Sequence, residues 1–483
     1  MAGTTQHLGG SNNNNNTNNE LEMSDSISVA APNTDTSSNK KHVEAMPGDD
    51  FETASKRIEE PLDAFGDETN AEIQYKTMSW WQASMVMVAE NISLGVLSLP
   101  AVIATVGLIA GLISIIALGI FASYSGYVLW QFRMRYPQVA SYTDVGRVLA
   151  GRLGYEIFSA AYVIYCLFFM ASHLLTFTIA LNVLSRHGTC TIVFGIVGLI
   201  VFSLLTIPRT LKNISFLSIV SFISIMSAVL ITIIALAVSP RAAYEDMQAV
   251  YHPNFPTAFN AICNAVFAYA GHVAWVSFIS ELRDPEDFPR ALGAQQLVQI
   301  VVYTVVSLVI YRYAGVDVSS PALSSTGEIV KKVAWGVALP TIIIAGVIFA
   351  HVNAKYIYMR MFAGTRYLHS RGWVATGTWI ALGFGTWTIA WIIAESIPNF
   401  SDLLGFVSAL FGAWFSFGVP GFLWLYMNQG LWFANWKKTC LFFMNVTLVI
   451  LGFIICGVGL YSSGWSMAQN SSGRVWSCAD NSP

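Results

Sequence analysis

Charged residues are scarce in this chain, and their scarcity limits what it can be. Only 11% of the 483 residues are Asp, Glu, Lys or Arg, while 54% are hydrophobic. Water-soluble globular domains carry about 25% charged residues, so the composition excludes an ordinary soluble enzyme. Basic residues interleaved with aromatic ones, which would form a nucleic-acid-binding face, are also missing. The composition predicts a protein whose main partner is the lipid bilayer.

Sequence signatures of catalysis and metal binding are missing as well. The chain has no Gly-x-Ser-x-Gly, His-Glu-x-x-His or phosphate-loop motif. Its six cysteines include no Cys-x-x-Cys pair, the spacing that is typical of zinc sites. We therefore expect neither an enzyme nor a metal site, and no organic cofactor.

What the chain has instead is a series of long apolar stretches. A hydrocarbon core of about 30 Å needs about 20 helical residues to cross it. Eleven stretches meet this length, and they predict an all-α polytopic membrane protein with a transmembrane domain over residues 77–462. The expected spans cover approximately residues 79–105, 108–132, 155–184, 191–207, 214–238, 257–281, 291–313, 334–358, 374–395, 401–427 and 440–462.

The first 76 residues have a different composition. They hold 14 acidic and 5 basic residues and a run of asparagines from Asn12 to Asn16. Such a segment cannot bury enough apolar surface to fold alone. We expect residues 1–76 to form a disordered acidic tail, which is a candidate region for regulatory or trafficking factors.

The basic residues predict the orientation. With eleven spans and a cytosolic N-terminus, 19 of the 25 Lys and Arg residues lie on the cytosolic side, as the positive-inside rule favours. Residues 463–483 then form a short extracytosolic tail. Cys190 and Cys478 share that outer side, where a disulfide is permitted, although we expect free thiols. Lys355 is expected to extend to the cytosolic surface.

The first span contains the most unusual stretch, from Glu90 to Pro100. Ser93 and Gly95 weaken a helix, and Pro100 cannot donate a hydrogen bond to the helix. Such interruptions are tolerated at membrane depth where the backbone faces protein or a water-filled cavity. We predict a helix break at Ser93 to Gly95, roughly 20 Å into the span.

A break at this depth offers chemistry for a solute. Free amide groups from Val96 onward, at the positive end of a helix dipole, would bind a carboxylate. The carbonyl groups that end the preceding half-helix would accept hydrogen bonds from an ammonium group. A free amino acid carries both groups, so Ser93, Leu94, Gly95 and Val96 are candidate substrate-binding residues. The alternative is a kinked helix with a structural role only.

The sixth span has a matching feature. The small residues Ala270 and Gly271 follow Tyr269 and precede His272, about 15 residues into the span. Alone they would suggest close helix packing. Breaks in the first helices of two five-helix halves, however, indicate an inverted-repeat transporter with its site near the midplane. A second break at Tyr269 to Gly271 would then lie at the same depth as the first.

Two titratable residues accompany these predicted breaks. Glu90 is the one acidic residue well inside a predicted span, and an ionisable group there is a functional hypothesis by default. His272 adjoins the second break, and imidazole titrates in a useful pH range. Both are candidates for proton coupling. The alternatives are a structural hydrogen bond for Glu90 and a packed neutral ring for His272.

Aromatic residues in the third span are also candidates for the site. Tyr162, Tyr165, Phe168 and Phe169 could wall a side-chain pocket, or they could serve only in helix packing. His173 and His351 are expected to be packed and neutral.

The sequence resembles the amino acid/auxin permease family, most closely its fungal neutral amino acid permeases of the methyltryptophan-resistance type. Asn91 to Pro100 is similar to the family pattern Gly-x-Gly-Val-Leu-x-Leu-Pro, with Ser93 in place of the first glycine. Phe267 to His272 is similar to Phe-Ala-Tyr-x-Gly-His, and the charged loop from Glu281 to Arg290 follows it.

The resemblance covers residues 77–462. It implies an eleven-helix protein with a five-plus-five inverted repeat of the LeuT type, broken helices 1 and 6, and amino acids as cargo, commonly carried with protons. It also implies that the substrate backbone is held by Ser93, Leu94, Gly95, Tyr269, Ala270 and Gly271.

Together these observations predict a plasma-membrane secondary transporter that imports neutral amino acids. Aliphatic side chains are expected and aromatic ones are left open. A proton gradient is the expected driving force, and sodium is not excluded. Two alternatives remain: a vacuolar carrier of the same family, and a membrane amino acid sensor that signals through the tail.

Overall fold

A computed structural model describes residues 75–209, 211–239, 247–368, 370, 372–470 and 475–482, without the side chains of residues 211–215 and 470. The expected acidic tail, apart from its last two residues, lies outside this range. In the described part the chain is helical, and its one β interaction is an isolated parallel bridge between Met78 and Leu282.

Every expected span corresponds to a helix or a helix pair. Ten are long and apolar enough to cross a membrane, and α5 is a shorter apolar helix. The helices are α2 (Trp80–Val106), α3 (Leu108–Arg135), α4 (Tyr142–Ser185), α5 (Thr191–Leu205), α6 (Leu211–Val238), α7 (Phe255–Ala268) with α8 (His272–Glu281), α9 (Phe288–Ala314), α10 (Glu328–Phe362), α11 (Trp373–Ser396), α12 (Phe400–Val407) with α13 (Val419–Met427), and α14 (Trp436–Asn470). Two π-helical turns over 408–418 join α12 to α13.

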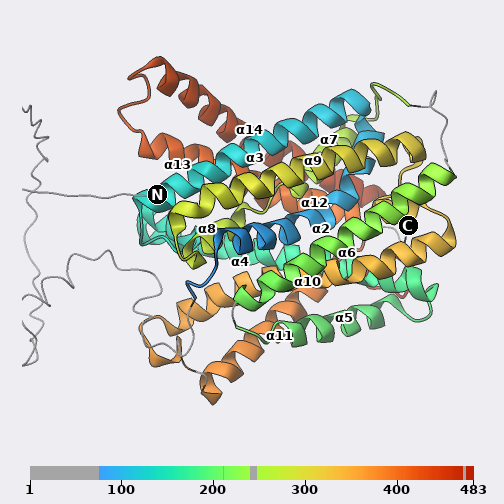
Figure 1. Cartoon of the computed structure of the whole chain (residues 1–483), viewed down its shortest axis with the longest axis horizontal. Helices are drawn as coiled ribbons and strands as arrows, with labels where there is room; N and C mark the ends of the chain where they lie inside the picture. The colour runs from blue at the N-terminus through green and yellow to red at the C-terminus, as the bar shows by residue number, and fades with distance from the viewer. Residues whose placement is uncertain are drawn as a thin grey trace, which may run out of the picture. The chain divides into compact units, whose positions relative to one another are not determined.

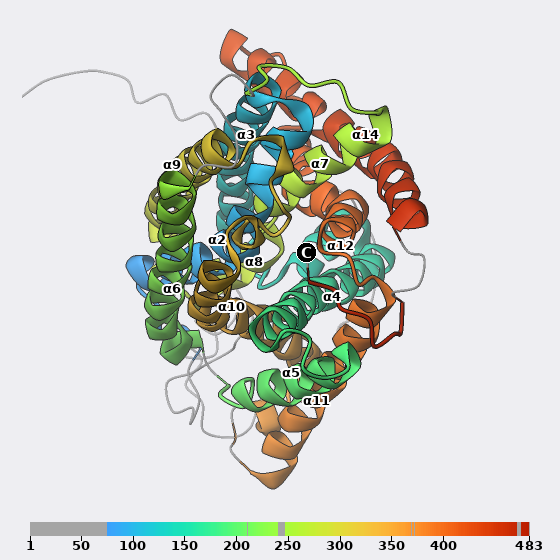
Figure 2. The same cartoon turned by 90° about the vertical axis from the view of Figure 1, so that its right-hand side faces the viewer.

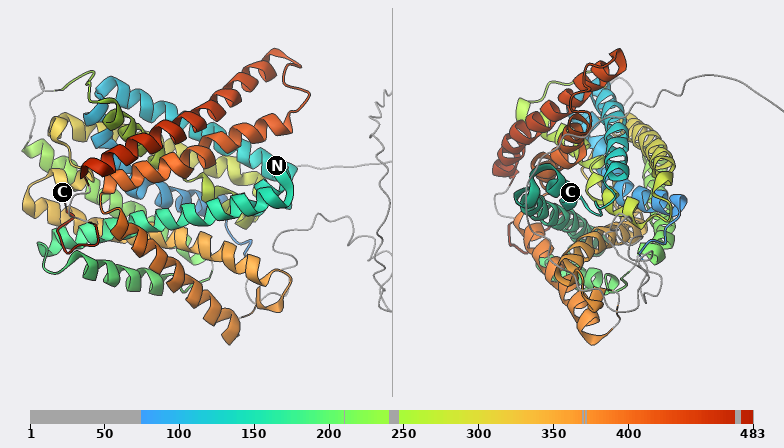
Figure 3. Two further views of the ribbon diagram at one scale, coloured as in Figure 1. Left: turned by 180° about the vertical axis from the view of Figure 1, so that it is seen from behind. Right: turned by 90° about the vertical axis from the view of Figure 1, so that its left-hand side faces the viewer.

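The spans run alternately between two ends of the bundle (Figure 1). We call the end that holds the start of α2 and the end of α8 the tail end. The opposite end is the disulfide end. Viewed along the helices (Figure 2), α2 and α8 lie inside a ring of α3, α4, α6, α7, α9, α10 and α12. In α2, 94% of the helix's most apolar 18-residue stretch is buried. In α14 only 22% of such a stretch is buried, and this helix lies on the outer face (Figure 3).

The predicted break in the first span is wrong, because α2 is a continuous helix from Trp80 to Val106. Local hydrogen bonds supplement the helix on both sides of the predicted break. Asn91 Nδ2 donates to the Met87 carbonyl at 2.9 Å, and Ser98 Oγ donates to the Gly95 carbonyl at 3.0 Å. Pro100 removes a single helical hydrogen bond. Unwinding would leave more backbone groups without partners in apolar surroundings, which is costly.

Gly95 serves close packing in α2. A methyl group added there would overlap the hydroxyl of Tyr303 in α9 and contact Ala268 Cβ at 3.1 Å. The Tyr303 hydroxyl lies 2.6 Å from the carbonyl of Asn91. The absence of a side chain at Gly95 thus lets α9 reach the backbone of α2.

The disulfide end contains a covalent link. Cys190, which precedes α5, is bonded to Cys478 near the C-terminus. Our expectation of free thiols at these two positions is therefore wrong. Their spacing of 288 residues gives no signal in the sequence, but the loop before α5 and the segment after α14 meet at the same end of the bundle. Thr191 Oγ1 also donates to the Ala479 carbonyl at 2.7 Å.

The tail end is closed by a short strap, residues 75–79. Met78 N donates to the Glu281 carbonyl at 3.1 Å, and Arg283 N donates to the Met78 carbonyl at 2.9 Å. Tyr75 is buried, and burial raises its pKa to about 12. Its phenol therefore stays protonated and donates to the Leu368 carbonyl at 3.4 Å.

Lys355 lies beneath this strap and does not extend to the surface as predicted. It is buried and forms an ion pair with the equally buried Glu281 at the end of α8. The prediction is wrong because Lys355 has a partner on another helix, Glu281. A buried lysine becomes stable when a carboxylate from another helix compensates its charge.

The packing at Gly95 leads to a first prediction. Gly95→Ala should lower the free energy of unfolding by about 1–3 kcal/mol, because overpacking a filled interior displaces its neighbours. Thermal unfolding of the purified protein in detergent measures the change. Gly385→Ala in α11 is the matched control, since a methyl group there meets nothing within 4 Å. An equal stability of both variants would contradict the packing at Gly95.

The covalent link leads to a second prediction. Maleimide labelling of the denatured, unreduced chain should modify four cysteines, namely Cys166, Cys263, Cys440 and Cys456. After reduction it should modify all six. Intact-mass spectrometry counts the labels, and six labels before reduction would exclude the disulfide.

Candidate functional site

The second predicted break is confirmed. Helix α7 ends at Ala268 and α8 begins at His272, so the three residues Tyr269, Ala270 and Gly271 interrupt the sixth span. Two of the three have small side chains or none, which lets other helices approach the backbone here. All three residues are buried, and they form the core of the candidate site.

Neighbouring helices hold the carbonyl groups at the break. The Ala268 carbonyl accepts hydrogen bonds from Gln299 Nε2 at 2.8 Å and from the Tyr303 hydroxyl at 3.0 Å, both in α9. The Ala270 carbonyl accepts one from the Tyr165 hydroxyl of α4 at 3.1 Å. The interrupted backbone is thus fixed by groups from two other helices.

The N-terminus of α8 is the part of the site whose chemistry suits an anion. Gly271 is its N-cap residue and supplies no side-chain hydrogen bond to the first turn. The first amide groups of a helix have no partner within it, and they carry the positive end of the dipole. They can therefore hold a carboxylate. The sequence placed this feature at Val96, but continuous helix surrounds Val96, so the structure has it at Gly271 instead.

Asn91 of α2 lies beside this helix start, since a methyl group added at Gly271 would meet its amide group at 2.6 Å. Ser93, Leu94, Gly95 and Val96 are all buried. The Ser93 hydroxyl has no hydrogen-bond partner among the described residues, and neither has the Tyr269 hydroxyl. Both are polar groups that could serve a ligand.

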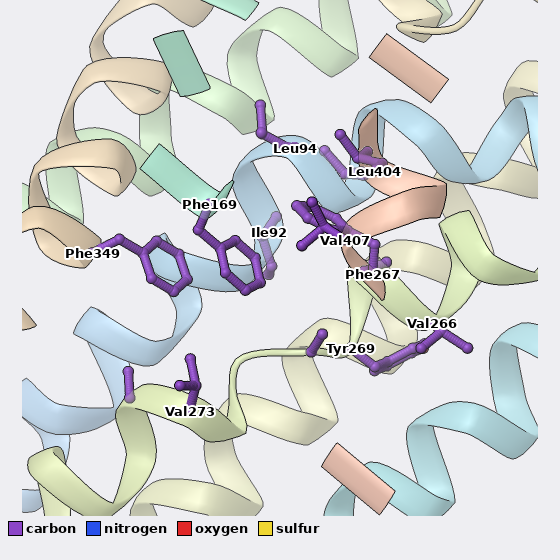
Figure 4. Close-up of a cluster of buried hydrophobic side chains, with 14 of the residues drawn as sticks. Ile92, Leu94, Phe169, Val266, Phe267, Tyr269, Val273, Phe349, Leu404 and Val407 are labelled. Carbon is purple, nitrogen blue, oxygen red and sulfur yellow. The ribbon is translucent and has the colours of Figure 1, made fainter. Parts of the chain in front are cut away.

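An apolar cluster adjoins the break (Figure 4). Phe169 is at its centre, stacked on Phe349 of α10 with ring centroids 4.1 Å apart and 4.9 Å from the ring of Phe267. Leu404 and Val407 of α12 are further members. The labelled side chains come from six helices and the break itself: Ile92, Leu94, Phe169, Val266, Phe267, Tyr269, Val273, Phe349, Leu404 and Val407. The cluster thus gives the break an apolar surrounding.

The other aromatic residues of α4 differ in what they contact. Tyr165 stacks on Phe415 at 5.2 Å and also bonds to the Ala270 carbonyl, so it joins packing to the site. Phe168 packs against Phe406 and Phe411 of the α12–α13 span. Tyr162 contacts the Tyr356 ring at 5.0 Å, toward the tail end.

Glu90 is buried in α2 with 3% of its surface exposed. Neither carboxylate oxygen has a hydrogen-bond partner among the described residues. A buried carboxylate without an ion pair in a membrane helix is a mark of function.

His272 faces a different helix. Its Nε2 lies 3.0 Å from the Ala122 carbonyl and 2.8 Å from Ser125 Oγ, both in α3. Its ring lies tilted against that of Trp275, with centroids 3.9 Å apart. Because a carbonyl only accepts, Nε2 is best satisfied when it carries a proton and donates to Ala122. This contact joins α8 to α3.

Three residues of the site were not predicted: Asn91, Gln299 and Tyr303. A signal for α9 does exist in the sequence. Gln295, Gln299 and Tyr303 recur every four residues, which places them on one face of the helix, and all three are buried. A polar face on a membrane helix must find polar partners, and this one finds the carbonyls of α2 and α7.

Two polar cavities flank the site along the bundle. One of about 250 Å³ at the disulfide end is lined by Ser98, Asn264 and Asp402 among others. The other, of about 260 Å³, lies at the tail end and is lined by Ser277, Glu281 and Lys355 among others. Along the sixth span, Asn264 of the first cavity comes before the interruption at residues 269–271, and Ser277 of the second comes after it.

Solved structures of two transporters share this fold. The first is Mhp1, a nucleobase-cation-symport-1 family transporter in a closed conformation with bromovinylhydantoin bound. The alignment has a TM-score of 0.53 and 13% identity and covers 84% of this chain and 96% of Mhp1. The second is MhsT in complex with L-phenylalanine, with a TM-score of 0.57 and 13% identity over 80% of this chain and 100% of MhsT. The expected five-plus-five inverted-repeat fold of the LeuT type is thereby confirmed.

Sequence comparison identifies the family. The chain is 36% identical over 402 residues to the N amino acid transport system protein of Neurospora crassa, covering 81% of this chain and 85% of that protein. A transmembrane transporter of Fusarium pseudograminearum is 29% identical, over 85% of this chain and 89% of its own length. Residues 76–463 match the family model described as transmembrane amino acid transporter protein. The chain therefore belongs to the transmembrane amino acid transporter family, whose members are transporters and not enzymes.

Proposed function

We propose that this protein is a secondary active transporter that imports neutral amino acids together with protons. One observation supports this most: the uncapped start of α8 at Gly271 lies beside an apolar cluster, and the unpaired carboxylate of Glu90 lies near the same break. These features supply a place for a carboxylate, a place for an apolar side chain, and a group that can carry a proton.

The proposed substrate follows from the chemistry around the break. The amide groups of α8 would bind the α-carboxylate, as helix N-termini bind anions. The cluster around Phe169 and Phe349 favours aliphatic and aromatic side chains over charged ones, because a charged side chain there would lose its hydration without compensation. The name of the Neurospora relative, an N amino acid transport system protein, supports a free amino acid as cargo.

The proposed proton site is Glu90. In apolar surroundings the neutral form of a carboxyl group is favoured, and access to water on one side of the membrane favours the charged form. Alternation between the two environments would bind and release a proton in each transport cycle. His272 remains a second candidate, although its Nε2 is already engaged with α3. Sodium as the coupled ion is tested below.

The proposed location is the plasma membrane with the N-terminus in the cytosol. This orientation places the Cys190–Cys478 disulfide outside, in an oxidising compartment where disulfides persist. A vacuolar membrane is the alternative, and fluorescence microscopy of a C-terminally tagged chain separates the two. Deletion of residues 1–70 tests the sensor alternative, because a transporter should keep its uptake without the tail.

Reconstituted uptake is the direct test. Proteoliposomes with an alkaline and sodium-free interior should accumulate labelled neutral amino acids from an acidic medium, and accumulation should stop when a protonophore removes the gradient. Labelled lysine and glutamate should not accumulate under the same conditions, because their side chains carry a net charge. Uptake that follows an imposed sodium gradient at equal pH would contradict proton coupling.

A substitution tests the role of Glu90. Glu90→Gln keeps the size of the side chain but cannot release a proton, so pH-driven accumulation should fall to the level seen without a gradient. Exchange of labelled for unlabelled amino acid should persist, because exchange needs no net proton movement. Glu328→Gln, at a carboxylate with 62% of its side chain exposed, is the matched control. Full pH-driven uptake by the Glu90 variant would exclude this carboxylate as the proton carrier.

A further inference from the structure

The cavity at the tail end is built differently from the candidate site. It measures about 260 Å³ and lies between α4, α8 and α10. Cavities for drug-sized ligands start at about 300 Å³, so this one suits a smaller solute. Nine of its fourteen lining residues carry a charge or a hydroxyl group, including Asp144, Arg147, Ser277, Glu281, Lys355 and Tyr356.

Two of the lining residues form a buried ion pair. The side chains of Glu281 and Lys355 are 2% and 6% exposed, and the Lys355 ammonium group contacts Glu281 Oε1. On the side of the strap, the Lys355 Nζ lies 5.1 Å from the centre of the Tyr75 ring. The pair is thus covered from the tail end and open toward the cavity, whose lining includes both residues.

We propose that this cavity is a second amino-acid site, in which the Lys355 ammonium binds the α-carboxylate of the substrate and the Glu281 carboxylate binds its α-ammonium group. The proposal rests on the proposed function and adds a site at which the substrate pauses on its way to the tail end. No covalent step is involved, and one ion pair is replaced by two.

The chemistry of the pair selects a zwitterion. Separating two buried opposite charges is strongly unfavourable unless each finds a new partner of opposite charge. A monoanion would pair with Lys355 and break its ion pair with Glu281, and a monocation would pair with Glu281 and break its ion pair with Lys355. A neutral amino acid brings both charges on adjacent atoms. The second site would therefore select for zwitterions in a cavity that the apolar cluster around Phe169 does not line.

A short route connects this cavity to the candidate site. Tyr356 lines the cavity, and its ring contacts Tyr162 with centroids 5.0 Å apart. Tyr162 lies one helical turn before Tyr165, whose hydroxyl bonds to the Ala270 carbonyl. On the other wall, Ser277 lies in α8 less than two turns after Gly271. An aromatic layer between α4 and α10 is what separates the two places.

The variants must remove both charges together. Removing either partner alone leaves an uncompensated buried charge and destabilises the fold, whereas replacing both with neutral groups of similar size is tolerated. The test variant is therefore Glu281→Gln with Lys355→Met. The matched control is Arg186→Met with Glu328→Gln, an exposed ion pair at the disulfide end. The exchange Glu281→Lys with Lys355→Glu keeps the pair and serves as a second variant if the neutral one fails to fold.

The experiment is equilibrium dialysis of the full-length purified chain with tritiated L-leucine and, separately, tritiated L-phenylalanine. We expect two molecules bound per chain for the unaltered protein, the control and the charge exchange, and one for the neutral double variant. A single bound molecule in every protein would overturn the second site and leave the proposed function intact. Two bound molecules in the neutral variant would overturn it as well. Binding to none of the proteins would refute the proposed function itself.

Discussion

One phenol hydroxyl connects the two central spans of this transporter. Tyr303 of α9 lies 2.6 Å from the carbonyl of Asn91 in α2 and 3.0 Å from the carbonyl of Ala268 at the end of α7. A hydroxyl has a single proton, so the two carbonyls share it. The hydroxyl therefore holds the first spans of the two repeats together at the depth where the sixth span is interrupted.

This connection requires other features of the sequence. Gly95 must lack a side chain for Tyr303 to reach α2. Gln299 shares the Ala268 carbonyl, which leaves the end of α7 with two donors.

The spans and their order could be predicted from the sequence, because long apolar stretches are local signals. The second break was predicted only together with the first, since Ala270 and Gly271 alone also fit close helix packing. The predicted first break is wrong, since Ser93, Gly95 and Pro100 look the same whether they weaken a helix or let another helix approach closely. The predictions for Lys355 and for Cys190 and Cys478 were wrong for a related reason. In each case a partner distant in the sequence decides the state of the residue. Gln299 and Tyr303 donate to the backbone carbonyls of Ala268 and Asn91. Every residue has such a carbonyl, so the sequence does not show which of them a side chain will bind.

The strap at the tail end gives the bundle a mechanical property. Met78 precedes α2 directly, and its backbone is bonded to residues 281 and 283 at the end of α8. Any tilt of α2 that keeps these two hydrogen bonds must carry the end of α8 with it. The first spans of the two repeats are thereby coupled at the tail end, and they would move together there.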